Sequence, residues 1–249
     1  LDKLKINKDK IIRYVTSWEK RHDSWVKDHL SSIVGSKYKT MNEIKGDLKK
    51  KLLNDWRVSF GFFVDRTTYQ SRKDTTNLKT ANYLFSLAMA MDKDCSTQTL
   101  SDYVYTVIQD KISGSVTHLR IPIDTERVES IASFLIDSKE KNFTKIVLEK
   151  SSNEYECIEF LKSFNRVGEK TANFYMKFIT WIFDPDFFAI TIDRHLYTSL
   201  LKYGLITDEN YKSAATAIKN LSKKIGMTPF QIETALYEES WLESNKMKD

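Results

Sequence analysis

The sequence predicts an all-α protein built as two helical lobes, and three observations lead to this fold class. Along most of the 249 residues, apolar side chains recur with the spacing of helices. Seven Gly and three Pro are few for this length, so a helix has few places where it must stop. Hydrophobic residues make up 41% of the chain, including 14 Phe and 12 Tyr, which supplies a substantial core and excludes a disordered chain.

The first expected helix covers residues 8–34, as one helix or two in tandem, and ends at Gly35. Thr40 and Glu43 form a capping box at the start of a helix that leads to Trp56. A short apolar run at 58–64 precedes a polar loop at 65–74, which is rich in side chains that bind phosphates or bases.

Two strongly apolar helices are expected at 77–91 and 99–112, and Asp124 is expected to cap the next one. Residues 143–148 fit either a short helix or a strand. Asn153 begins another short helix, with Glu156 three residues on as in a capping box. The apolar face of that helix contains Tyr155, Ile158, Leu161 and Phe164.

A reversal at residues 167–168 follows, because glycine tolerates the backbone angles of a tight turn. The next helix, at about 171–183, is apolar around nearly its whole circumference, so we expect it to be buried. Asp193 heads a further helix, and residues 211–225 form an amphipathic helix that Gly226 stops. Thr228 and Gln231 begin the last helix.

Composition limits the function classes. A net charge of +5 permits a nucleic-acid partner without requiring one, since a Lys-rich surface is also explained by solvation alone. Two cysteines, Cys95 and Cys157, fit a reducing intracellular compartment and exclude a four-cysteine iron–sulfur cluster within this chain. Because no run approaches the ~18 apolar residues of a membrane span and no three-ligand metal pattern appears, we expect no membrane, metal or cofactor.

Two motifs in residues 153–201 carry a family resemblance. Residues 164–172 read Phe-Asn-Arg-Val-Gly-Glu-Lys-Thr-Ala, which resembles the Leu-Pro-Gly-Val-Gly-x-Lys-Thr-Ala hairpin of the helix-hairpin-helix DNA glycosylase superfamily. Residues 190–196 resemble the segment that carries that superfamily's catalytic aspartate, typically Val-Asp-Thr-His. Without a cluster, the chain resembles the endonuclease III-like members that lack iron and sulfur.

Two residues depart from the motif. Arg166 replaces the first glycine of the hairpin, and Glu169 occupies a position that is usually neutral or basic. Both lie where backbone amides of the motif bind a DNA phosphate. Arg166 could supply a positive charge that compensates for the missing glycine in binding the phosphate, but the negative charge of Glu169 would oppose this binding.

The resemblance implies a fold with the site between its lobes. Residues 57–187 would form a helical barrel ending in the helix-hairpin-helix, and residues 1–56 and 188–249 would form a second helical lobe. The hairpin motif would lie at the cleft, with Lys170 on one wall and Asp193 on the other. Hairpin contacts to DNA would come from Arg166, Val167, Gly168 and Thr171.

Lys170 is expected in the first turn of a helix, where the helix macrodipole disfavours a cation. The same field favours the neutral, nucleophilic amine. In family members with a lysine here, the amine attacks the sugar C1′, displaces the base and forms a Schiff base, and β-elimination then cleaves the strand. The alternative is an ordinary surface lysine at the end of a hairpin.

Asp193 heads a helix, where aspartate is also an ordinary N-cap. A carboxylate held there stays ionised and would stabilise the positive charge that develops on the sugar when a glycosidic bond breaks. His195, two positions further on, is expected to pack or to form a hydrogen bond rather than to act in catalysis.

The loop at 65–74 offers a counterpart to the family's Gln-Gln-Thr triplet, which fills the space left by an extruded base. Its candidate residues are Arg66, Thr67, Thr68 and Gln70. The alternative is an ordinary connection between helices. Tyr69, Phe187 and Phe188 are candidates to stack on an extruded base, or are simply core residues.

The interpretation is a monomeric DNA base-excision enzyme acting on duplex DNA with an extruded base, with a lysine Schiff base for the lyase step. Two alternatives stay open. One is a phage-type enzyme that hypermodifies thymine in DNA on a related fold, and the other is a DNA-binding module without enzymatic activity.

Overall fold

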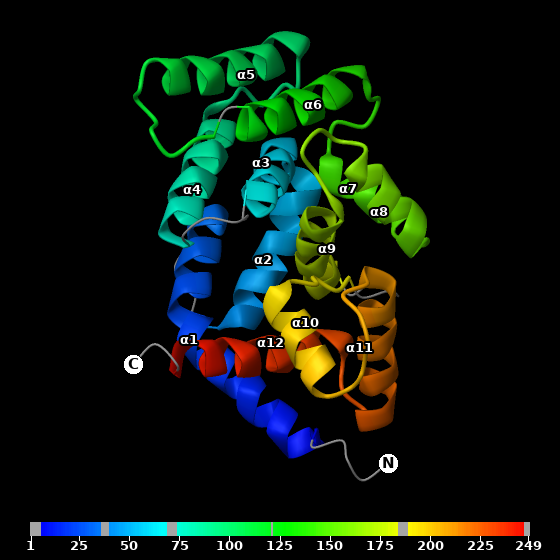
Figure 1. Cartoon of the computed structure of the whole chain (residues 1–249). Helices are drawn as coiled ribbons and strands as arrows, with labels where there is room; N and C mark the ends of the chain where they lie inside the picture. The colour runs from blue at the N-terminus through cyan, green and yellow to red at the C-terminus, as the bar shows by residue number, and fades with distance from the viewer. Residues whose placement is uncertain (1–5, 36–39, 69–73, 121, 184–188, 247–249) are drawn as a thin grey trace. The chain divides into compact units, whose positions relative to one another are not determined.

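The computed structural model of the chain describes residues 6–35, 40–68, 74–120, 122–183 and 189–246, and all regular secondary structure in them is helical (Figure 1). The fold class predicted from the sequence, all-α, is therefore confirmed. The helices are α1 (Lys8–Val34), α2 (Met41–Asn54), α3 (Trp56–Thr68), α4 (Asp74–Ala90), α5 (Thr97–Ile112), α6 (Ile123–Asp137), α7 (Phe143–Lys150), α8 (Glu154–Lys162), α9 (Glu169–Phe183), α10 (Arg194–Lys202), α11 (Tyr211–Ile225) and α12 (Pro229–Lys246).

Contacts divide the chain into two compact units. The central unit is His29–Phe187, and the chain-end unit joins Leu1–Asp28 with Phe188–Asp249. This grouping differs from the expected lobes in residues 29–56, which lie with the central unit. The physical reason is packing, because α2 contacts α3, α7 and α9, and His29 hydrogen-bonds Asp65 of α3.

The core of the central unit is a cluster of aromatic rings around α3. Phe63 packs at 4.5 Å, between ring centroids, from Phe143 of α7 and at 5.0 Å from Tyr175 of α9. Residues 58–68 of α3 are all buried, the polar side chains among them included. The segment at 143–150, which the sequence allowed to be a helix or a strand, is the helix α7. Asn142 caps this helix.

The core of the chain-end unit is aliphatic. Its buried side chains come from α1, α10, α11, α12 and the segment before α10, and include Ile11, Ile190, Ile192, Leu196, Leu200, Ala214, Ile218, Leu221, Ile232 and Leu236. A polar network closes one edge: Tyr203 donates to Glu239 at 2.6 Å, and Lys10 pairs with the same carboxylate at 2.9 Å. This network ties α1 to α10 and α12.

Local signals in the sequence place most helix ends. Thr40 and Glu43 form the predicted capping box, and Thr228 and Gln231 exchange the corresponding bonds at α12. Gly226 ends α11 in the left-handed conformation. The expected cap at Asp124 is wrong, because α6 begins one residue earlier and the Asp124 carboxylate accepts instead from the Arg120 amide.

Glycines in two helices give a matched test of packing. A Cβ built at Gly61 in α3 would lie 2.8 Å from a ring carbon of Phe85 and 3.1 Å from Cβ of Ala88, both in α4, whereas one at Gly46 in α2 meets nothing within 4 Å. We expect Gly61→Ala to destabilise the protein by about 1–3 kcal/mol through overpacking. We expect Gly46→Ala to stabilise it by about 0.4–1 kcal/mol, because alanine restricts the unfolded chain.

Urea denaturation of both variants measures this difference. Equal stability changes of the same sign in the two variants would mean that α3 and α4 do not approach as closely as described.

Candidate functional site

The α8–α9 hairpin is the central element of the candidate site. Asn153 caps α8 by accepting from the Glu156 amide, as predicted. Ile158, Leu161 and Phe164 are buried, but Tyr155 is 74% exposed, so its expected place on the apolar face is wrong. Tyr155 lies in the first turn of α8, where nothing covers that side of the helix among the described residues.

The chain reverses at Arg166 rather than at Gly168. Arg166 has φ 61° and is the one non-glycine residue among those described with a positive φ, whereas Gly168 lies outside that region. The interpretation that Gly168 provides the backbone freedom of the turn is therefore wrong. Left-handed backbone strongly favours glycine, and Arg166 stands where the hairpin motif has its first glycine.

Helix α6 holds this strained turn from outside the hairpin. Arg127 donates to the carbonyl of Arg166 at 3.2 Å, and Ser130 accepts from the Asn165 amide at 3.1 Å. Glu126 accepts from Nε of Arg166 at 2.6 Å. Sequence reasoning missed these residues of α6, because nothing near residues 123–137 signals a partner some 40 positions further on.

Hydrophobic contacts with α6 and α7 also hold the turn in place. Phe164 lies 5.3 Å, between ring centroids, from Phe134 of α6 and 5.6 Å from Phe143 of α7. Val167 is 4% exposed, so its side chain belongs to the core and leaves only its backbone for a ligand. The turn is thus anchored to the aromatic core of the central unit.

The start of α9 presents an open backbone and an exposed amine. Gly168 is exposed, and a Cβ added there would meet nothing within 4 Å. Lys170 is exposed in the first turn of α9, and no carboxylate of the described residues pairs with it. Thr171 is 9% exposed, so it lies at the edge of the core. The first-turn amides of any helix have no i−4 carbonyl partner, which makes this region suited to an anion.

Asp193 belongs to the chain-end unit. Ile190 and Ile192, which precede it, are buried and fix the strand-like approach to α10. Its Oδ1 accepts from the Leu196 amide at 3.0 Å, so Asp193 is the N-cap of α10, as the sequence predicted. The carboxylate is half-buried, and Oδ2 accepts no hydrogen bond from the described residues. One oxygen of the carboxylate therefore caps the helix, and the other accepts no hydrogen bond from the residues that the structure describes.

His195 lies in the first turn of α10, and its side chain contacts α12. Its Nδ1 lies 3.2 Å from the hydroxyl of Ser240, and its ring meets Tyr237 edge-on at 5.5 Å. These contacts match the expectation that His195 packs and hydrogen-bonds.

The candidate DNA contacts at 66–68 are not in a loop. Arg66, Thr67 and Thr68 continue α3 and are at most 2% exposed. Arg66 pairs with Asp65 and lies 4.7 Å from the ring of Phe178, and each threonine hydroxyl donates to a carbonyl one helical turn earlier. The expectation of an exposed loop is wrong for these residues, because α3 continues through them into the core. Gln70, Tyr69, Phe187 and Phe188 lie outside the described residues.

Two further observations bear on the kind of site. In the part of the chain that the structure describes, no group of three or more His, Cys, Asp or Glu side chains is placed to hold a metal ion. Among the same residues, no helix combines the length and the apolar composition needed to cross a membrane.

Both cysteines are free, and burial raises the pKa of the Cys157 thiol to about 11.

No protein-family model, curated protein or solved structure matches this chain. The assignment of a function therefore depends on the residues of the hairpin and of Asp193 themselves.

Proposed function

We propose that this protein binds DNA through the α8–α9 hairpin and excises a base by cleaving its N-glycosidic bond. The observation that supports this best is the combination at the start of α9. A turn in the glycine-favouring conformation leads to a glycine whose Cβ position is open, and then to an exposed lysine. Among the described residues, no atom lies within 4 Å of a Cβ built at Gly168, so the backbone there is open to a ligand that approaches it closely.

In this proposal a DNA phosphate accepts from the amides at the start of α9. Phosphate at a helix N-terminus is favoured by both the orphan amides and the macrodipole. Arg166 adds a positive charge beside the turn, although its Nε is engaged by Glu126. The target base leaves the stack before chemistry, as enzymes that act on bases in a duplex require.

Lys170 and Asp193 then divide the chemistry. The neutral amine of Lys170 attacks C1′ of the sugar, and the bond from C1′ to the base breaks with its electron pair leaving on the base, which takes up a proton. Asp193 stabilises the positive charge that develops on the sugar, through the oxygen that does not cap α10. The bond from C1′ to the ring oxygen then breaks as the nitrogen lone pair forms the C=N bond of a Schiff base on Lys170, and the ring oxygen takes up the proton that the amine has released. Loss of a proton from C2′ then expels the 3′-phosphate by β-elimination, which cleaves the strand.

A pair of substitutions at the turn tests the DNA contact. Gly168→Ala places a methyl group in open space, so we expect no loss of thermal stability. If a phosphate occupies that space, the variant loses a charge-assisted hydrogen bond of about 1.5–3 kcal/mol, which is roughly a 10- to 100-fold loss of affinity for an abasic duplex.

Arg166→Gly removes the charge and also relieves the strain of the left-handed backbone at this position. A loss of binding therefore cannot be attributed to a distorted turn. We expect it to flatten the log–log dependence of affinity on salt by about 0.9 for one lost phosphate contact. Fluorescence anisotropy over a salt series measures both quantities. Unchanged affinity in both variants would show that the hairpin does not bind the DNA backbone.

A further inference from the structure

Helix α11 carries most of the net positive charge of the chain. It contains four lysines, Lys212, Lys219, Lys223 and Lys224, and no acidic residue. The whole chain has 39 Lys and Arg against 34 Asp and Glu, a net charge of +5. One helix of 15 residues thus holds a formal +4, while charges of both signs are mixed over the rest of the chain.

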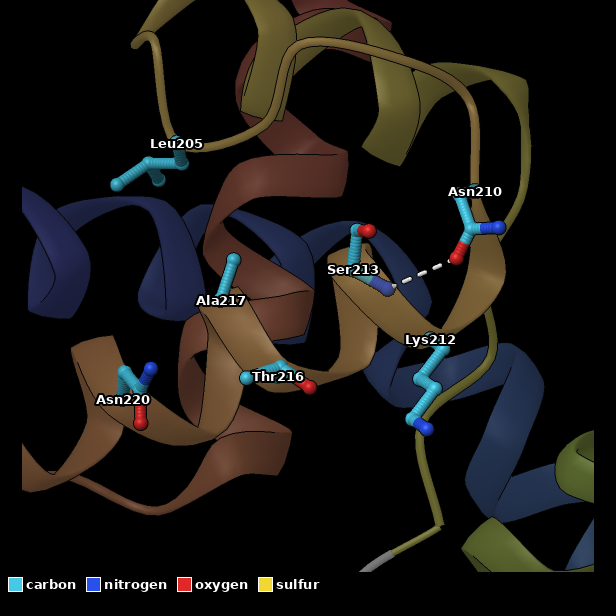
Figure 2. Close-up of a pocket in the computed structure, with 7 residues that line it drawn as sticks. All are labelled: Leu205, Asn210, Lys212, Ser213, Thr216, Ala217 and Asn220. Atoms are coloured by element: carbon cyan, nitrogen blue, oxygen red, sulfur yellow. Dashed lines mark hydrogen bonds between the residues drawn. The ribbon is translucent and has the colours of Figure 1, made fainter.

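The exposed face of α11 is mostly polar, with Ala217 as an apolar residue among those that line it. Ser213, Thr216 and Asn220 follow the i, i+3, i+7 spacing of one helix face, and each is exposed. Together with Asn210 and Lys212 they line a shallow hollow of about 370 Å³ that is open to solvent (Figure 2). Hydroxyl, amide and ammonium groups are the side chains that contact phosphate and sugar in protein–DNA complexes.

Lys212 lies at a position that is electrostatically unfavourable for a cation. It lies in the first turn of α11, where the macrodipole disfavours a cation, and it borders the hollow. Lys223 and Lys224 lie in the last turn, where cations are favoured, and extend the same face. At 1.5 Å of rise per residue, Lys212 and Lys224 are about 18 Å apart along the helix, which spans several phosphates of a strand.

The other face of α11 argues against a membrane surface as the partner. Ala214, Ile218 and Leu221 are buried in the core of the chain-end unit. A helix that binds a membrane interface must insert its apolar face among the lipids. Because this apolar face is already covered, charge complementarity is what α11 offers, and a polyanion fits it better than a lipid surface.

We propose that the exposed face of α11 is a second contact surface for DNA, binding the phosphodiester backbone without reading sequence. It lies in the chain-end unit, whereas the hairpin lies in the central unit. The inference rests on the proposed function only in the choice of DNA as the polyanion. Lys212, Lys223 and Lys224 supply the charge, and Ser213, Thr216 and Asn220 supply neutral hydrogen bonds.

The test is a charge-matched pair of triple variants. In the first, Lys212, Lys223 and Lys224 become Gln. In the control, the exposed residues Lys79, Lys93 and Lys139, all in the central unit, become Gln, so both proteins lose three charges. Gln has nearly the helix propensity of Lys, and circular dichroism verifies that both variants are folded.

We expect the α11 variant to bind duplex DNA roughly 10- to 100-fold more weakly than the control variant near 0.1 M salt, with a log–log salt slope flatter by up to about 2.7. Equal affinity and slope in the two variants would overturn the inference. The inference would also be overturned if the wild type binds vesicles of phosphatidylcholine and phosphatidylserine, and if the α11 variant loses this vesicle binding while its DNA binding stays intact.

Base release and adduct formation are measured separately on the same proteins. If the α11 lysines are needed for DNA binding but no base is released and no adduct forms, the inference holds and the excision proposal fails. If an adduct forms at equal DNA affinity in both variants, the excision proposal holds and the inference fails. A wild type that binds no DNA refutes both.

Discussion

Borohydride should trap the wild-type protein covalently on a duplex that contains an abasic site, and Lys170→Ala should abolish the adduct. The Schiff base between the amine and C1′ is the species that borohydride reduces. Lys170 is exposed and unpaired among the described residues, so its removal leaves no buried charge behind. Lys170→Arg keeps the charge but has no amine for a Schiff base, and should fail in the same way.

Lys162→Ala is the matched control for this experiment. Lys162 is on the same hairpin but pairs with Glu159 at 2.6 Å, and its loss should leave the adduct unchanged. An adduct that persists in Lys170→Ala would assign the nucleophile to another amine. On a duplex that still carries the target base, base release by the wild type without any adduct would mean that water, not Lys170, attacks the sugar.

Asp193→Asn should slow adduct formation roughly 100-fold or more while DNA affinity stays near that of the wild type. The substitution removes charge stabilisation that acts in the transition state. Asn caps helices about as well as Asp, so the N-terminus of α10 stays intact and a slow reaction cannot be attributed to unfolding. Single-turnover kinetics on a duplex whose base the wild type releases measure the rate, and a rate equal to that of the wild type would remove Asp193 from the chemistry.

Asp65→Asn should destabilise the fold by about 3–5 kcal/mol, because breaking a buried ion pair leaves an uncompensated charge in the core. The Asp65 carboxylate is fully buried between Nε2 of His29, at 2.8 Å, and Nε of Arg66, at 2.6 Å. Burial alone would raise the pKa of Asp65, but the charges and hydrogen bonds of Arg66 and His29 bring that pKa below its usual range.

The direction of the pKa shift fixes the pH dependence. A carboxyl group with a lowered folded-state pKa contributes its full stability above its unfolded pKa of about 3.9, and this contribution is lost as the pH falls below that value. The stability difference between wild type and Asp65→Asn in urea should therefore shrink in acid. Asp47→Asn is the control, since Asp47 is 42% exposed and 3.9 Å from Lys50, and it should change stability by less than about 0.5 kcal/mol. A small effect of Asp65→Asn at neutral pH would contradict the buried ion pair.

Local signals in the sequence are enough to predict the helical fold class and most helix ends. Asn153, Asp193 and Thr228 cap the helices they were expected to cap, and Gly226 ends α11 as predicted. Each of these signals is local: a side chain accepts from an amide two or three residues further on, or a glycine adopts a left-handed angle. Such interactions are settled within one turn of the chain and need no tertiary context.

The accessibility of polar residues, in contrast, depends on tertiary contacts. Residues 65–68 have the composition of a loop, yet the pairing of Asp65 with His29 and Arg66 lets α3 carry them into the core. The reversal at Arg166 likewise depends on α6. Arg127 and Glu126 hold Arg166 at a positive φ, which residues with a side chain disfavour. These contacts join residues up to 40 positions apart, and a sequence pattern read over one helical turn contains no information about them.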